Sequence, residues 1–195
     1  MSKSDAASAK KERNKAIRWV VTIFIITILI SATISFVSEE VMSASSMVVA
    51  FLILFFIIIV GIIFDIIGVA VTSADEKPFH SMAARKVPGS QEAIRLLRNA
   101  SRVGSICNDV IGDICGVVSG AASATIAAQI ISNFTFSWPR IISLAMSALA
   151  AGVTVGGKAI GKSFAIRSCT KIVYGTGKVI WAFKHLPQRL FGKKK

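Results

Sequence analysis

Residues 47–71 read MVVAFLILFFIIIVGIIFDIIGVAV, and Asp65 is the one charged side chain among them. The run is longer than the ~20 apolar residues that an α-helix needs to cross a bilayer. It therefore predicts a membrane-spanning helix. Because lipid penalises a carboxylate unless it meets another charge, an ion or water, Asp65 is also the first candidate for a functional residue.

Three further stretches are apolar enough to cross a bilayer, at residues 17–37, 103–131 and 141–166. The chain has 195 residues, 53% of them hydrophobic, so four crossings leave no room for a large soluble domain. We predict an all-α polytopic membrane protein with about four transmembrane helices. An enzyme is not expected, because neither His80 nor His185 stands in a motif with a nucleophile.

The formal net charge is +13, and the basic residues cluster in three blocks, at 3–18, 77–102 and 158–195. By the positive-inside rule these blocks are cytoplasmic, with both termini inside and the short connections 38–45 and 133–139 outside. We expect a multi-pass protein of the cytoplasmic membrane that contacts anionic headgroups. Nucleic acid is not expected as a partner, because no reader module accompanies the basic runs.

Two segments resemble helices that lie on the inner membrane surface. Pro88 and Gly89 split the basic segment 75–102 into two predicted short helices, at 80–86 and 90–101. In the tail, Val179 and Phe183 fall on the opposite side of a helix from the basic residues, which is typical of an interfacial helix.

Four charged side chains lie deep inside the predicted crossings: Asp65, Asp109, Asp113 and Lys158. Counted inward at ~1.5 Å per residue, all four lie roughly 10 to 16 Å deep, near the middle of a ~30 Å hydrocarbon core. We therefore expect them to share one polar pocket, in which the Lys158 ammonium pairs with Asp109 or Asp113.

Four local patterns follow one another between residues 50 and 185. They are Ser73-Ala74-Asp75-Glu76, the segment RKVPGSQEAIRLLRNASRVGS at 85–105, Cys107-Asn108-Asp109, and the segment that carries Gly157, Lys158, Gly161, Lys162, Ser163 and Ala165. In order and spacing they resemble the S-x-S-E motif, the basic hairpin, the G-N-N/T type motif and the G-E-x-x-P-K motif of the CorB/CorC and cyclin-M (CNNM) magnesium exporters. The resemblance covers the transmembrane domain of that family.

The resemblance implies a domain organisation. A three-helix domain is expected at 46–166, including the cytoplasmic hairpin 75–102, with an extra N-terminal anchor and outer turn at 17–45. Basic tails flank them at 1–16 and 167–195. Family members dimerise through this domain, so a homodimer is expected. The cytosolic CBS pair and the C-terminal domain usual in the family are not expected.

In the family, a serine of the first motif, an asparagine of the second and a glutamate of the third help bind Mg²⁺ in the membrane. By position, the resemblance implies a metal site at Ser73 and Asn108, with Asp75 in the motif of Ser73, and Mg²⁺ as the transported ion without any other cofactor. Lys158 occupies the place of the glutamate. An ammonium has donors but no acceptor, so Lys158 is not a magnesium ligand.

Two functions follow, and the sequence leaves both open. In the first, Asp109 and Asp113 supply the missing carboxylates as metal ligands, and the chain transports magnesium or regulates its transport. In the second, Lys158 takes the place of the cation, and the chain is a non-transporting membrane interaction protein whose buried charges neutralise one another.

Overall fold

A computed structural model describes residues 3–134 and 138–191, and these form helices and short connections, with no strand among them. Four helical stretches are long and apolar enough to cross a membrane: Ile17–Ser43, Met47–Ser73, Ala100–Asn133 and Pro139–Arg167. The prediction of an all-α polytopic membrane protein with about four transmembrane helices is therefore confirmed.

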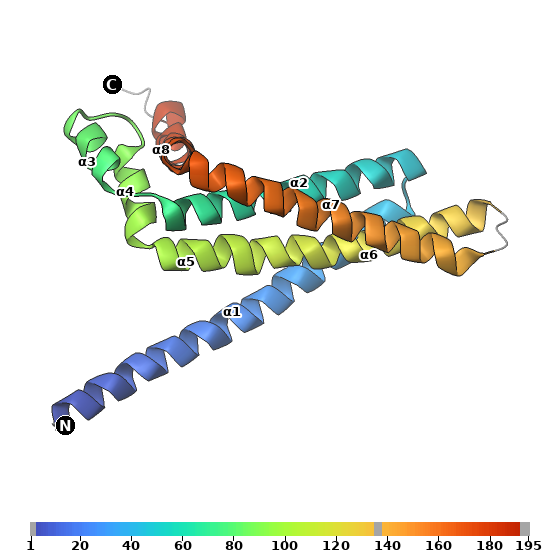
Figure 1. The fold of residues 1–195 in the computed structure, drawn as a ribbon, viewed down its shortest axis with the longest axis horizontal. Helices are drawn as coiled ribbons and strands as arrows, with labels where there is room; N and C mark the ends of the chain where they lie inside the picture. Colours follow the sequence, from blue (N-terminus) through green and yellow to red (C-terminus); the bar gives the residue numbers. More distant parts are fainter. Residues whose placement is uncertain (1–2, 135–137, 192–195) are drawn as a thin grey trace.

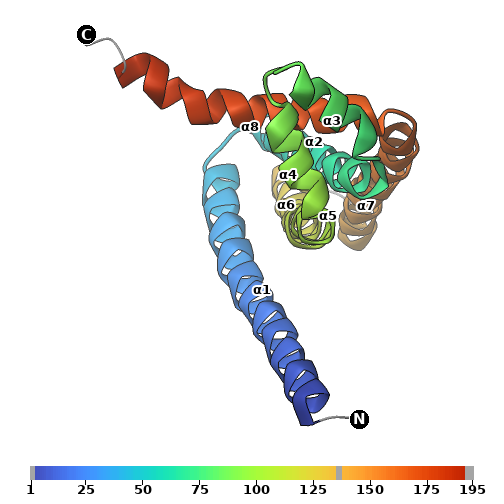
Figure 2. The same cartoon turned by 90° about the vertical axis from the view of Figure 1, so that its left-hand side faces the viewer.

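Three crossings form a bundle (Figure 1). They are α2 (Met47–Ser73), the continuous rod of α5 (Ala100–Gly104), η1 (Ser105–Gly112) and α6 (Asp113–Asn133), and α7 (Pro139–Arg167). The helix α1 (Lys3–Ser43) packs along α6 and diverges from the bundle toward its N-terminus (Figure 2). At the point of divergence the Arg102 guanidinium lies 5.5 Å from the centre of the Trp19 ring.

The helix α1 is continuous from Lys3, so the predicted polar tail at 1–16 and the predicted anchor belong to one helix. Residues 1–2 of that tail, residues 135–137 of the predicted outer turn and residues 192–195 of the basic tail lie outside the described part of the chain. The first turn is shorter than the predicted 38–45, because α1 extends to Ser43 and α2 begins at Met47.

The connections lie at two opposite ends of the bundle (Figure 1). The N-terminus, the basic hairpin and the tail helix lie at one end, and the connections after Ser43 and Asn133 lie at the other. This is the alternation that an even number of crossings requires. We refer below to the first of these as the hairpin end.

The basic segment folds into α3 (Lys77–Ala84) and α4 (Ser90–Arg98). The chain reverses between them at Lys86 and Gly89, which have φ angles of 54° and 86°. Glycine adopts this left-handed conformation without the Cβ clash that other residues meet. The reversal therefore occurs at the Pro88-Gly89 pair that the sequence analysis identified.

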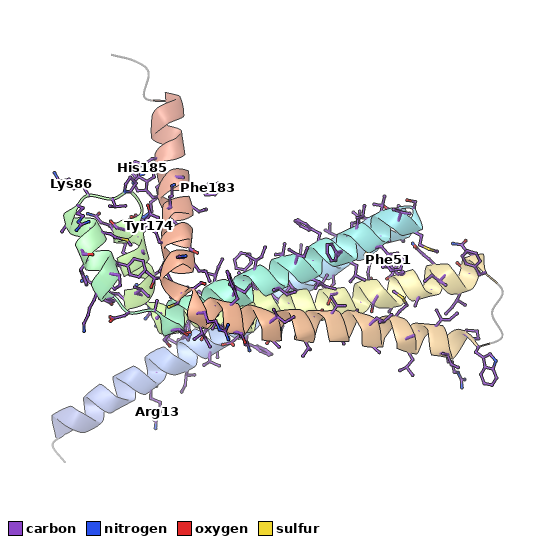
Figure 3. All side chains as sticks on the ribbon, turned by 45° about the horizontal axis from the view of Figure 1, so that its top comes forward. Arg13, Phe51, Lys86, Tyr174, Phe183 and His185 are labelled. Atoms are coloured by element: carbon purple, nitrogen blue, oxygen red, sulfur yellow. The ribbon has the colours of Figure 1, made fainter. Side chains whose placement is uncertain are left out.

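The tail forms α8 (Cys169–Phe191), which lies across the hairpin end and packs on α4. In Figure 3, His185 lies on the side of α8 that faces the hairpin and Phe183 lies on the opposite side. Phe183 is 71% exposed, and Val179 one turn earlier is also exposed. An exposed apolar stripe on a surface-lying helix suits the headgroup boundary of a bilayer.

A salt bridge joins α8 to α4. The Glu92 side chain, 9% exposed, accepts hydrogen bonds from Lys184 Nζ at 2.9 Å and from Arg95 Nη1 at 3.1 Å. The hydrogen bond from Lys184 holds the pKa of Glu92 below its ordinary value, although desolvation acts in the opposite direction. Because the ionised carboxylate is favoured, α8 and α4 are joined by a charge-assisted contact at neutral pH.

Two apolar clusters hold the ends of the bundle. At the hairpin end, eight buried residues of α2, α3, α4, α7 and α8 pack together: Ala70, Val71, Phe79, Ala93, Ile94, Leu97, Ala165 and Val173. At the opposite end, Met42, Ala50, Leu54, Ile58, Ala122 and Ile126 form the second cluster. Asp65 of α2 and Lys158 of α7 lie between the two clusters.

The third crossing departs from α-helical geometry at η1, which is a π-helix. A π-helix bonds i to i+5, is rare, and is found often at functional sites. Here it carries Asn108, Asp109 and Gly112 and ends where Asp113 begins α6. This widened turn interrupts the regular helix predicted for 103–131.

Candidate functional site

The site begins on one face of α2, where Gly61, Asp65 and Gly68 follow one another at helical spacing. All three residues are buried, and Asp65 is 3% exposed. The two glycines let the third crossing approach closely. A Cβ at position 61 would lie 2.8 Å from Cβ of Cys115, which leaves no room for a larger side chain. Asp65 therefore faces the third crossing.

Asn108 of η1 lies against Gly68. A Cβ at position 68 would overlap the Asn108 amide, lying only 2.7 Å from its Cγ. One turn further, a Cβ at Gly104 would lie 2.8 Å from Cγ2 of Thr72. The two antiparallel helices are thus in register at Gly68 and Asn108.

Lys158 reaches the same place from α7. Its Nζ donates a hydrogen bond to the backbone oxygen of Gly112, at 3.1 Å. A Cβ added at Gly112 would lie 3.4 Å from Lys158 Nζ and 3.9 Å from Asp65 Oδ1. The ammonium and the carboxylate therefore border one small volume beside Gly112, although they form no direct ion pair in the described chain.

Two buried oxygens at this site have no hydrogen-bond partner among the described residues: Asp65 Oδ2 and Asn108 Oδ1. Each buried acceptor without a partner costs roughly 1–3 kcal/mol, and more when it is charged. Native structures rarely leave such atoms without water or an ion, so each one requires an explanation. These two oxygens come from facing helices inside a membrane-spanning bundle.

Asp109 and Asp113 do not join this site. Both are exposed on the outer side of η1 and α6, and no ion pair of the described residues involves either. The expected ion pair between Lys158 and Asp109 or Asp113 is therefore not formed. The expectation rested on depth, and depth does not say which way a side chain faces. Asn108 and Gly112 face the bundle, and Asp109 and Asp113, each one residue later, lie about 100° further round the helix.

Ser73 and Asp75 also lie apart from Asn108. Gly68 is level with Asn108 and Thr72 is level with Gly104, so Ser73 lies more than one turn nearer the hairpin end. Both Ser73 and Asp75 are exposed, and Asp75 Oδ1 accepts the backbone N–H of Lys77 at 3.2 Å. Of the four charges expected to share a pocket, the structure brings together Asp65 and Lys158, with Asn108 beside them.

Three hard oxygens lie along this contact: the Asp65 carboxylate and the backbone oxygen of Gly112, which border the volume beside Gly112, and the Asn108 amide oxygen, which lies against Gly68. Carboxylate and carbonyl oxygens are the ligands that Mg²⁺ and Ca²⁺ prefer, and Mg²⁺ commonly keeps several waters beside one or two carboxylates. Among the described residues no group of three or more His, Cys, Asp and Glu side chains gathers as a metal site. The site therefore offers a single carboxylate.

The spacing of two glycines around Asp65 is a sequence signal for this arrangement that the prediction did not use. Gly61 and Gly68 flank Asp65 at spacings of four and three, on one face of the most apolar span. In a membrane, small residues mark the face of a helix that contacts another helix. The pattern therefore predicts that Asp65 lies at a helix–helix contact. Asp109 and Asp113 share a helix face with Val117, and all three side chains are exposed.

Comparison of the chain with protein-family models, with curated proteins and with solved structures finds no match.

Proposed function

We propose that this protein binds a divalent cation, magnesium, within the membrane and carries it across or regulates its passage. Asp65 supplies the charged ligand and Asn108 a neutral one, with the cation between α2 and η1. The family resemblance of the sequence motivates the choice of magnesium. The observation that carries the proposal is the pair of buried oxygens without partners, Asp65 Oδ2 and Asn108 Oδ1.

The surroundings support this proposal. The oxygens lie at a π-helix, between apolar clusters at the two ends of the bundle, and a cation bound between them would give each a partner. The proposed ligands differ from those that the resemblance implies, since Asp65 replaces Asp109 and Asp113, and Ser73 and Asp75 take no part.

A second candidate function is favoured by Lys158. Its amino group already donates to Gly112 and lies beside the Asp65 carboxylate, where a cation would otherwise bind. In that case the charges only neutralise one another, and the chain is a non-transporting membrane protein that acts through contacts with partners. The two candidates differ in whether the protein responds to magnesium.

The test is flux. The purified protein is reconstituted in liposomes loaded with a magnesium indicator, and Mg²⁺ is added outside. Transport predicts a signal well above that of protein-free liposomes and saturation with external Mg²⁺. No flux, together with no stabilisation of the purified protein by Mg²⁺ in a thermal unfolding assay, would reject the proposal and favour the second candidate.

We further propose that the chain forms a homodimer that covers Asp109 and Asp113. Two exposed carboxylates at membrane depth require a polar partner. Lys162 is exposed on α7, and counted at ~1.5 Å per residue from the ends of the predicted crossings it lies ~6 Å deep, within one helical turn of the ~9 Å of Asp109. A two-fold interface pairs each Asp109 with the Lys162 of the other copy.

Open glycines support this interface. Cβ atoms at Gly116 and Gly120 of α6, or at Gly152 and Gly156 of α7, would meet nothing within 4 Å. Gly157 and Gly161, in contrast, are in contact with α2. Exposed small residues beside an intramembrane charge allow a second helix to approach closely.

The dimer is tested by exchanging charges. Asp109→Lys or Lys162→Asp alone is expected to shift the detergent-solubilised protein toward monomer in light scattering, because each variant puts like charges face to face. The double variant is expected to restore the dimer, whereas Lys171→Asp on α8 has no effect. A protein that is monomeric before any substitution, or a double variant no better than the singles, would contradict the proposed interface.

Orientation completes the proposal. The hairpin end is cytoplasmic, because it carries the three basic blocks, and α8 with α3 and α4 lies against anionic headgroups of the cytoplasmic membrane.

A further inference from the structure

Lys158 is the one group at the proposed site that repels a cation. It reaches the Gly112 oxygen from a third helix, so its charge borders the same small volume as the Asp65 carboxylate. It is half-buried, whereas Asp65 is buried. The site therefore combines a fixed carboxylate with a tethered ammonium.

A divalent cation and this ammonium exclude one another. A cation bound to Asp65 lies within about 2.1 Å of a carboxylate oxygen. Lys158 Nζ and Asp65 Oδ1 both lie within 4 Å of a single point beside Gly112. Like charges this close repel strongly in a medium of low dielectric constant. Lys158 also occupies one of the two lone pairs of the Gly112 oxygen.

We propose that Lys158 is a displaceable, built-in competitor: its ammonium occupies the site when no cation is bound, and cation entry requires it to swing out. This inference rests on the proposed function and adds its regulation. Lysine suits the role because a strongly hydrated point charge on a flexible four-carbon stem changes position easily. The single backbone hydrogen bond that Lys158 makes is a weak tether compared with the paired contacts of Glu92.

The competitor also keeps the empty site stable. Without it, Asp65 would be a buried carboxylate with no positive charge nearby, which a membrane interior penalises. The empty site therefore holds one negative and one positive charge. The free energy needed to move the Lys158 ammonium out of the site lowers the affinity of the site for a cation.

The test compares Mg²⁺ binding by the full-length protein in detergent, measured by titration calorimetry after chelator treatment. Lys158→Met removes the charge while keeping a similar length, and we expect its affinity for Mg²⁺ to rise by at least about tenfold. Lys158→Arg keeps the charge and should not gain affinity. Lys171→Met, which removes a charge from α8 outside the site, is expected to match the unmodified protein. If Lys158→Met does not yield folded protein, Lys158→Gln replaces it.

The outcomes separate this inference from the proposed function. Measurable Mg²⁺ binding by the unmodified protein with no gain in Lys158→Met overturns the competitor and leaves the cation site intact. An equal gain in Lys171→Met also overturns it, because the effect is then one of overall charge. If neither the unmodified protein nor Lys158→Met binds Mg²⁺, the cation site itself is rejected, and the competitor with it.

Discussion

Replacing Asp65 with asparagine is expected to abolish magnesium flux and to weaken Mg²⁺ binding by at least about 10- to 100-fold, the loss typical of removing even a residue that supports a metal ligand. Among the described residues, Asp65 supplies the only carboxylate at the proposed cation site. An asparagine amide keeps the shape of this side chain but not its negative charge. Flux in liposomes and titration calorimetry measure the two effects.

Controls distinguish a lost ligand from a lost fold. Asp65→Asn leaves the Lys158 ammonium without a nearby carboxylate, which by itself destabilises a buried site. The double variant Asp65→Asn/Lys158→Met removes both charges, so it should regain thermal stability but not flux. Asp75→Asn should transport normally, since Asp75 is exposed near the hairpin end. Loss of flux in Asp75→Asn with full flux in Asp65→Asn would favour the ligands implied by the family resemblance instead.

Gly177→Ala is expected to detach α8 from the hairpin. A Cβ at Gly177 would lie 2.6 Å from the backbone oxygen of Gly89 and 2.9 Å from the backbone nitrogen of Ala93, and backbone atoms do not move aside cheaply. Overpacking of this kind costs typically about 1–3 kcal/mol. The opposing gain in helix propensity on replacing glycine is at most about 1 kcal/mol. The expected result is a lower unfolding temperature and faster proteolysis within residues 169–191.

The chain offers a matched control on the same helix. Gly175 lies two residues earlier, is exposed, and has nothing within 4 Å of an added Cβ. Gly175→Ala should therefore show only the propensity gain and stabilise α8 slightly. Equal stabilisation by both substitutions would mean that α8 does not pack on α4 through Gly177.

At the hairpin end, short-range sequence signals predict the break between the two surface helices but not the exact helix bounds. Pro88 and Gly89 predicted the break between two surface helices, and the break lies there because only a left-handed residue completes the reversal. The bounds were less accurate. The first short helix is Lys77–Ala84 rather than 80–86, because the chain already turns at Lys86. Contacts with α8, which lies about 90 residues away along the chain, hold the second helix in place.

Span length and charge blocks are local properties of the chain, so the amino-acid sequence alone predicts the four crossings and their alternation. It did not determine the rotation of each helix about its axis. In a bilayer the lipid-facing and protein-facing sides of a helix are both apolar, so no hydrophobic stripe separates them. The rotation that turns Asp65 and Asn108 inward, and Asp109 and Asp113 outward, goes with the close contacts at Gly61 and Gly68. Which carboxylate lies near Lys158 depends on this rotation, and it is therefore seen in the tertiary structure and not in the sequence.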